Sequence, residues 1–332
     1  MLRWLLRITT LVLFSISAYT ALSYWRYDEY AIDAARLFSQ QITPEILREK
    51  VDAAIAANRP DEARLYLQLG QTFGVSLNQS RYDAALQALD SPFNHATRTV
   101  TEFTNGFLDG SAETEAGVIG AIASDFTVIG DVRDLWEQYS LYTQNQPTND
   151  LVVALAGVGV GLTAATVVSV GSSSPVKAGV STLKIATRTG RLTPRFQAYL
   201  TRQASNVFDT RAFLHSAKQE QNFEGITRAV RDAYHPAAVE TLSGLATRAN
   251  TIRQASSLLD TVHLLQYVES ADDLRRLEKL TVKYGSKTKG IMLLLGRSAI
   301  GTIRVLRRTT ELVVSLMSTL LSFLGMLLVW RR

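Results

Sequence analysis

Three aspartates in one short run, Asp125, Asp131 and Asp134, come closest in type and spacing to a site for chemistry, and Gly130 lies among them. Clustered carboxylates are the ligands that hard cations prefer, so the run admits a cation site. Its spacing matches no calcium-loop pattern, however. Asp131 and Asp134 are three residues apart, which is equally typical of acids in the first turn of a helix. We therefore favour a helix start over a metal site.

Other motifs for catalysis or cofactor binding are missing. The chain has no cysteine, which excludes disulfides, thiolate metal sites and cysteine nucleophiles. Its four histidines, His95, His215, His235 and His263, lack metal-ligand spacing. Neither a nucleophile elbow nor a phosphate-binding glycine loop is present. Aromatic residues do not interleave with the basic ones as they do in binders of single strands. We predict no catalytic, cofactor-binding or metal-binding residue, no cofactor and no nucleic-acid partner.

The elements that would position such side chains are organised by charge. Residues 26–150 carry 9 Lys/Arg and 19 Asp/Glu, whereas residues 172–311 carry 22 Lys/Arg and 11 Asp/Glu. Residues 151–171, between these two regions, carry no charge. Two soluble domains of opposite sign would account for this pattern. A membrane that separates an acidic from a basic region would account for it as well.

The sequence near both ends of the chain is typical of membrane spans. Residues 8–25 are 18 residues without a charge, flanked by Trp4 and Trp25, and residues 312–330 are 19 uncharged residues closed by two arginines. These lengths suit the hydrocarbon thickness of a bilayer, and tryptophans favour its interfaces. The alternative for the first segment is a cleaved signal peptide. We predict an N-terminal transmembrane anchor over 1–25 and a C-terminal transmembrane helix over 312–332.

Small residues recur on one face of the last span and of the uncharged middle stretch. Such faces let another helix approach closely, which permits homo- or hetero-oligomers in a membrane. The residues are Ser315, Ser318, Ser322 and Gly325 in the last span, and Gly157, Gly161, Ala165 and Ser169 in the middle stretch. We predict that 151–171 is a transmembrane or re-entrant segment, because the sign of the charge changes across it. The alternative is a buried core segment of a soluble domain.

Basic residues near the span ends predict the orientation. Arg3 and Arg7 place the N-terminus in the cytoplasm, so that 26–150 is periplasmic and 172–311 is cytoplasmic. If the middle stretch does not cross, both termini are cytoplasmic and residues 26–311 lie outside.

Helix signals are clear at several points of the polar regions. Thr43-Pro44-Glu45 begins a helix over 46–57, and a second helix over 61–73 follows Pro60. The pair resembles a tetratricopeptide hairpin, although a small helical bundle is the favoured interpretation because a solenoid needs about three repeats. Ser270 followed by Asp273 predicts another helix start.

Residues 290–308 are apolar except for their arginines, of which Arg297, Arg304 and Arg308 share one helical face. Such a stripe favours the surface of an anionic membrane. The alternative is a core helix with one solvated face.

The run SDFTVIGDVRDLWEQY, then LVVALAGVGVGLTAATV and SPVKAGVSTLKIATRTGRL, resembles a group of uncharacterised proteobacterial membrane proteins. The run and the apolar stretch are also similar, more weakly, to hydrophobic modules of bacterial polymorphic toxins. Neither resemblance implies an activity or a catalytic residue for this chain.

Together these features predict an all-α integral membrane protein of the bacterial inner membrane, with two or three transmembrane helices and two helical polar regions. We expect a multi-pass, non-enzymatic protein that acts through helix packing and partner contacts in a lipid bilayer. A pore-forming or toxin-like protein is the first alternative, and a membrane enzyme without a recognisable motif is the second.

Overall fold

The computed structural model describes residues 2–26, 33–90, 128–166, 174–219, 223–301 and 311–330. Every regular element in these ranges is a helix, apart from one isolated antiparallel β-bridge between Phe208 and Tyr234. The predicted all-α class is therefore confirmed. The chain divides into two units: unit 1 is Met1–Thr43 with Arg297–Arg332, and unit 2 is Pro44–Gly296.

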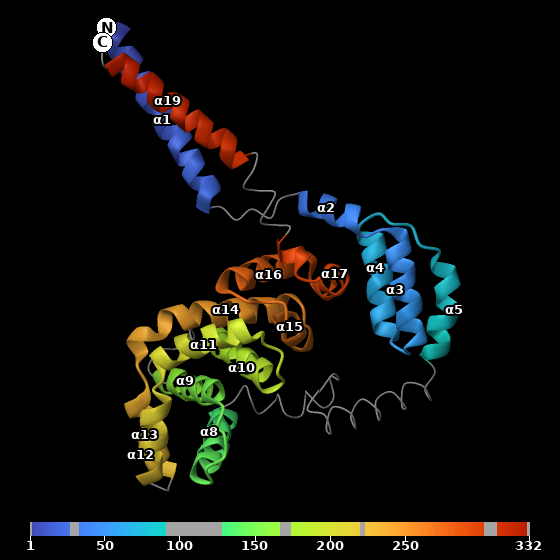
Figure 1. The fold of residues 1–332 in the computed structure, drawn as a ribbon, viewed down its shortest axis with the longest axis vertical. Helices are drawn as coiled ribbons and strands as arrows, with labels where there is room; N and C mark the ends of the chain where they lie inside the picture. Colours follow the sequence, from blue (N-terminus) through green and yellow to red (C-terminus); the bar gives the residue numbers. More distant parts are fainter. Residues whose placement is uncertain are drawn as a thin grey trace. The chain divides into compact units, whose positions relative to one another are not determined.

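Unit 1 is built on a helical hairpin. Helix α1 (Leu2–Arg26) packs along α19 (Glu311–Trp330), and α2 (Asp33–Gln41) follows α1 in the chain (Figure 1). The two long helices are antiparallel, because Phe14 meets Phe323 while the later Ser17 meets the earlier Ser318. Within the described side chains, which leave out several near the helix ends, no helix is both long and apolar enough to cross a membrane.

Unit 2 begins with three helices that pack on one another, α3 (Pro44–Ala56), α4 (Pro60–Thr72) and α5 (Gln79–Leu89). Helix α3 starts at the predicted proline. The chain turns after α4 at Gly74, whose φ of +71° lies in the left-handed region that glycine tolerates best. Among the described residues, α5 accompanies a single helix pair, which agrees with a small bundle better than with a repeat array.

The remaining helices of unit 2 include α9 and the five helices that pack against it. They are α8 (Val128–Thr143), α9 (Asp150–Thr166), α10 (Ser174–Arg188), α11 (Pro194–Val207), α12 (Thr210–Gln219), α13 (Phe223–Ala233), the 3-10 helix η1 (Pro236–Ala238), α14 (Val239–Ala255), α15 (Leu258–Leu265), α16 (Ala271–Tyr284) and α17 (Lys287–Leu295). Helices α8, α10, α11, α12 and α13 all pack against α9. Residues 151–159 of α9 are buried as a result.

The small-residue ridge of α9 receives two aromatic rings. A Cβ atom on Gly157 would lie 2.4 Å from the ring of Phe208, and one on Gly161 would lie 2.6 Å from the ring of Tyr234. These two rings belong to the residues that form the β-bridge. The bridge therefore presents both rings to two glycine notches one helical turn apart.

The prediction that residues 151–171 cross or re-enter a membrane requires correction for the part that the structure describes. Helices of the same unit cover the described part of this uncharged stretch. Helix α9 therefore agrees with the alternative interpretation, a buried core segment. The predicted separation of an acidic region, 26–150, from a basic region, 172–311, also fails as a domain boundary. Helix α8 from the first region and α10 from the second pack around α9 in one unit.

The helix at the end of unit 2 is shorter than the one predicted over 290–308. Helix α17 ends at Gly296, whose φ is +57°, and its residues Ile291 and Met292 are fully buried. This agrees with the core-helix alternative rather than with a membrane-surface stripe. Arg304 and Arg308 lie outside the described residues. The predicted start of α16 is confirmed, because Ser270 accepts a hydrogen bond from the backbone N–H of Asp273 at 3.1 Å.

Candidate functional site

Helices α8 and α10 bring a cluster of charged side chains into the interior of unit 2. The buried face of α8 contains Asp131, Asp134 and Leu135, spaced as neighbours on one side of a helix. The facing side chain is Lys184 of α10, which stands alone in an otherwise uncharged run from 178 to 187. Two carboxylates and one ammonium group are thus buried at the same place.

Lys184 lies between the two aspartates. Its Nζ donates to Oδ1 of Asp131 at 2.6 Å and is also 2.6 Å from Oδ2 of Asp134. None of the three side chains is more than 1% exposed. Burial of an unpaired charge costs several kcal/mol, so each of these groups depends on the others for its ionised state.

Partly exposed residues extend the cluster toward solvent. Arg188 donates to Oδ1 of Asp134 at 2.6 Å and to Oε2 of Glu137 at 3.2 Å. At the other end of the cluster, Nζ of Lys177 is 4.0 Å from Oδ2 of Asp131 and donates to the hydroxyl of Thr163 at 2.7 Å. We call the set Asp131, Asp134, Glu137, Lys177, Lys184 and Arg188 the α8–α10 cluster.

Asp131 is the carboxylate of the α8–α10 cluster whose pKa is raised by burial. Burial raises its pKa to about 6, although the charges of Lys184 and Lys177 pull this pKa down. Burial lowers the pKa of Lys177 in turn, with Asp131 opposing. Gly159 of α9 makes room for the carboxylate, because a Cβ at this position would lie 2.3 Å from Oδ2 of Asp131.

The structure therefore joins two of the three aspartates that suggested a cation site. Their cation is the ammonium group of Lys184, and Asp125 lies outside the described residues. No group of three or more His, Asp or Glu side chains suited to a metal ion occurs within the ranges described. Lys184 was not singled out from the sequence, although a lone lysine inside an otherwise uncharged run can indicate a buried ion pair.

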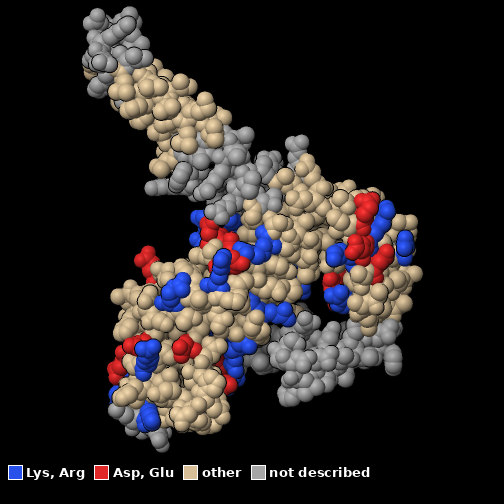
Figure 2. All heavy atoms as spheres, viewed as in Figure 1, with Lys and Arg blue, Asp and Glu red and all other residues tan. Residues whose placement is uncertain are grey.

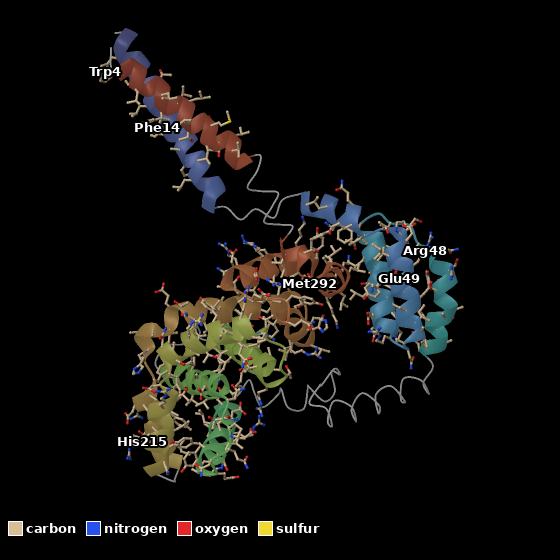
Figure 3. The ribbon with its side chains drawn as sticks, viewed as in Figure 1. Trp4, Phe14, Arg48, Glu49, His215 and Met292 are labelled. Atoms are coloured by element: carbon tan, nitrogen blue, oxygen red, sulfur yellow. The ribbon has the colours of Figure 1, made fainter. Side chains whose placement is uncertain are left out.

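The described histidines belong to different parts of unit 2. His215 is exposed on α12 (Figure 3), His235 precedes η1, and His263 on α15 contacts Gln266 and Tyr267. His95 lies outside the described residues.

A cavity of about 310 Å³ lies among α4, α15 and α17. Its charged lining is already paired within the protein, since Lys289 is 3.1 Å from Asp260 and Arg64 is 3.1 Å from Asp61. Glu62, the third acid of the lining, is paired with Arg59 at 2.6 Å, so each charged side chain of the cavity already has a partner of opposite sign.

The α1–α19 hairpin is the second feature with functional meaning. Among the described residues, eight exposed large apolar side chains lie on α1 and nine on α19, against four elsewhere. Trp4 projects from the hairpin in Figure 3, and the side chains of the hairpin that the structure describes are uncharged in Figure 2. The hydroxyl of Ser17, by contrast, bonds that of Ser318 at 3.0 Å and lies 3.3 Å from that of Thr319. The partly buried hydroxyls of Ser17 and Thr319 and the rings of Phe14 and Phe323 thus meet between the two helices, while most of the large apolar side chains face outward.

Comparison with known proteins provides no relative for either feature. No protein-family model, curated protein or solved structure matches this chain.

Proposed function

We propose that this chain is a bacterial inner-membrane protein whose α1–α19 hairpin inserts into the bilayer and holds unit 2 at the membrane. The apolar outer surface of the hairpin, with 17 exposed large apolar side chains on two helices, is the observation that carries the proposal. A helix pair in water buries its apolar side chains and exposes its polar ones. Helices in lipid do the reverse where small and hydroxyl residues meet at their interface.

The dimensions of the hairpin support insertion. At a rise of 1.5 Å per residue, the 25 residues of α1 extend roughly 37 Å and the 20 residues of α19 roughly 30 Å. The hydrocarbon core of a bilayer is about 30 Å thick. In the full sequence, the uncharged runs 8–25 and 312–330, which include residues whose side chains the structure does not describe, cover most of these lengths.

The proposal has both termini in the cytoplasm and unit 2 on the periplasmic side. An antiparallel hairpin places the start of α1, whose sequence contains Arg3 and Arg7, at the same end as the close of α19, which Arg331 and Arg332 follow in the sequence. Basic residues in short flanking segments are retained in the cytoplasm, whereas long domains translocate largely regardless of their charge. Residues 172–311, which were predicted from the sequence to be cytoplasmic, are periplasmic in this proposal, because α8 and α10 belong to one unit.

Unit 2 acts in this proposal as a non-enzymatic module that contacts a partner near the bilayer. The pore-forming or toxin-like alternative drew on the glycine-rich stretch and on its weak resemblance to toxin modules. Aromatic rings of the same unit fill the notches at Gly157 and Gly161, which leaves only the resemblance in its support. The small-residue face of α19 is likewise engaged with α1 through Ser318 and Thr319, so it supports a hairpin rather than an oligomer.

A matched pair of substitutions tests the anchor. Leu321 on α19 and Val282 on α16 are 65% and 61% exposed, respectively. Leu321→Asp should reduce the fraction of chain that resists carbonate extraction, because a carboxylate at the centre of a span costs about 2.5–3.5 kcal/mol. Val282→Asp should leave that fraction unchanged. Equal behaviour of the two variants, or a wild-type chain that carbonate removes, would contradict the anchor.

A labelling experiment tests the orientation. Because the chain has no native cysteine, the Lys283→Cys variant introduces a single exposed thiol in unit 2. An impermeant thiol reagent should modify it in cells whose outer membrane has been permeabilised, without lysis of the inner membrane. Modification only after the inner membrane is opened would reverse the proposed orientation while leaving the anchor intact.

A further inference from the structure

Asp131 is a buried carboxylate with only one of its oxygens satisfied. Oδ1 accepts a hydrogen bond from Lys184 at 2.6 Å. Oδ2 has no hydrogen-bond partner among the described residues, and Lys177, the next base, is 4.0 Å away and bonded to Thr163 instead. A proton on Oδ2 would remove the buried negative charge without displacing any hydrogen bond.

We propose that Asp131 is a proton-binding site that controls how firmly α8 is held against α9 and α10. The docked helix keeps Asp131 at 1% exposure beside Gly159, whereas a detached α8 returns the carboxylate to water. The docked state therefore binds a proton more tightly than the detached state. This property of unit 2 is independent of the proposed membrane anchor.

The direction of the effect follows from linkage. Burial raises the pKa of Asp131 to about 6 in the docked state, and water restores it to about 3.9 in the detached state. The docked state then binds more protons between these values, so its advantage grows as the pH falls. With these two pKa values the docking equilibrium changes about tenfold between about pH 8 and about pH 5.

The neighbouring charged groups limit the alternatives. Helix α8 itself contributes Arg133, Asp134 and Glu137 around Asp131, and α10 contributes Lys177, Lys184 and Arg188. Helix α9 has no titratable residue from 151 to 166. Helix α12, which also packs on α8, carries the exposed residues Arg211, His215 and Lys218. His215 is the competing group, because an ordinary histidine titrates at about pH 6.5.

A buried thiol on α8 measures docking directly. Leu135 is fully buried on α8, so the Leu135→Cys variant of the full chain in detergent reacts with a thiol reagent only when α8 detaches. Its labelling rate is divided by that of the same variant unfolded in denaturant at each pH, which removes the titration of the thiol itself. The resulting protection should rise about tenfold from about pH 8 to about pH 5. The Leu47→Cys variant, with its fully buried thiol on α3, should show no such rise.

Three further substitutions in this background decide the origin of the rise. Asp131→Asn should abolish it, while His215→Gln should leave it intact. Lys177→Met should move its midpoint to higher pH, since the charge of Lys177 lowers the pKa of Asp131. Lys177 is partly exposed, so this variant decides the question even where Asp131→Asn fails to fold. A rise that survives Asp131→Asn, disappears in His215→Gln, or keeps its midpoint in Lys177→Met would overturn the proposal.

Discussion

Replacement of Lys184 by methionine is the most informative perturbation of unit 2. The substitution keeps an unbranched side chain of similar length at a fully buried position and removes only the charge and its hydrogen bonds. Two carboxylates then lose the ammonium group that lies 2.6 Å from each of them. Asp134 keeps Arg188 at 2.6 Å, but Asp131 keeps only Lys177 at 4.0 Å.

The expected loss is about 3–5 kcal/mol of unfolding free energy near neutral pH, the usual result when one partner of a buried ion pair is removed. Protonation of Asp131 limits this loss, because a neutral acid tolerates burial better than a carboxylate does. Loss of Lys184 raises the pKa of Asp131 further, so the destabilisation should shrink as the pH is lowered toward about 6, the pKa of Asp131 in the wild-type fold, and level off below that pH. A loss that came only from altered packing would not change with pH.

Urea denaturation of the full chain in detergent measures the effect. Trp136 lies on α8 and reports on unit 2 once the other three tryptophans, Trp4, Trp25 and Trp330, are replaced by phenylalanine. Lys218→Met on the exposed surface of α12 is the matched control and should stay within about 0.5 kcal/mol of the parent.

A double variant separates charge from packing. Addition of Asp131→Asn to Lys184→Met removes the stranded carboxylate and should recover at least about 2 kcal/mol, a coupling within the range for contacting residues. The reasoning would be refuted by a Lys184→Met loss below about 1 kcal/mol, or by a double variant less stable than the single one.

Two further pairs of substitutions test the close approaches of helices in unit 2. Gly179→Ala would place a Cβ 1.7 Å from a backbone carbonyl oxygen of α14, so we expect the free energy of unfolding to fall by about 3 kcal/mol or more. Gly244→Ala on α14, where a Cβ meets nothing within 4 Å, should instead raise the free energy of unfolding by about 0.5–1 kcal/mol. Denaturant unfolding measures both changes. Gly161→Leu should destabilise unit 2, because a Cβ there would lie 2.6 Å from the ring of Tyr234. Val160→Leu, at a half-buried position, should be tolerated. Equal shifts of the two variants in thermal unfolding would argue against the glycine notch.

The local signals in the sequence were reliable where chemistry fixes the backbone. Pro44 starts a helix because it needs no N–H partner and its φ is already helical, and Ser270 caps another with its hydroxyl. The uncharged stretch after Asp150 forms a helix as well. These features depend on neighbouring residues only, so one sequence is enough to predict them.

The environment of α9 was not predictable by the same means. A run of apolar and small residues satisfies a lipid bilayer and a protein core equally, because both exclude water and both reward close helix contact. The aromatic rings that fill its notches come from Phe208 and Tyr234, which are 51 and 73 residues beyond Gly157 and Gly161, respectively. No local pattern in residues 151–171 could identify these distant partners.

The charge pattern of residues 26–150 and 172–311 also contains a signal that the two regions meet. Regions of net negative and net positive charge that follow one another can lie in different compartments, but they can equally attract each other within one fold. Asp131 and Asp134 occupy an apolar helical stripe, and Lys184 interrupts an apolar run, so none of them can be buried alone without a cost of several kcal/mol. Opposite charges embedded in two apolar faces are therefore a stronger signal than the net charge of either region. They require the two faces to meet, which excludes a membrane between α8 and α10.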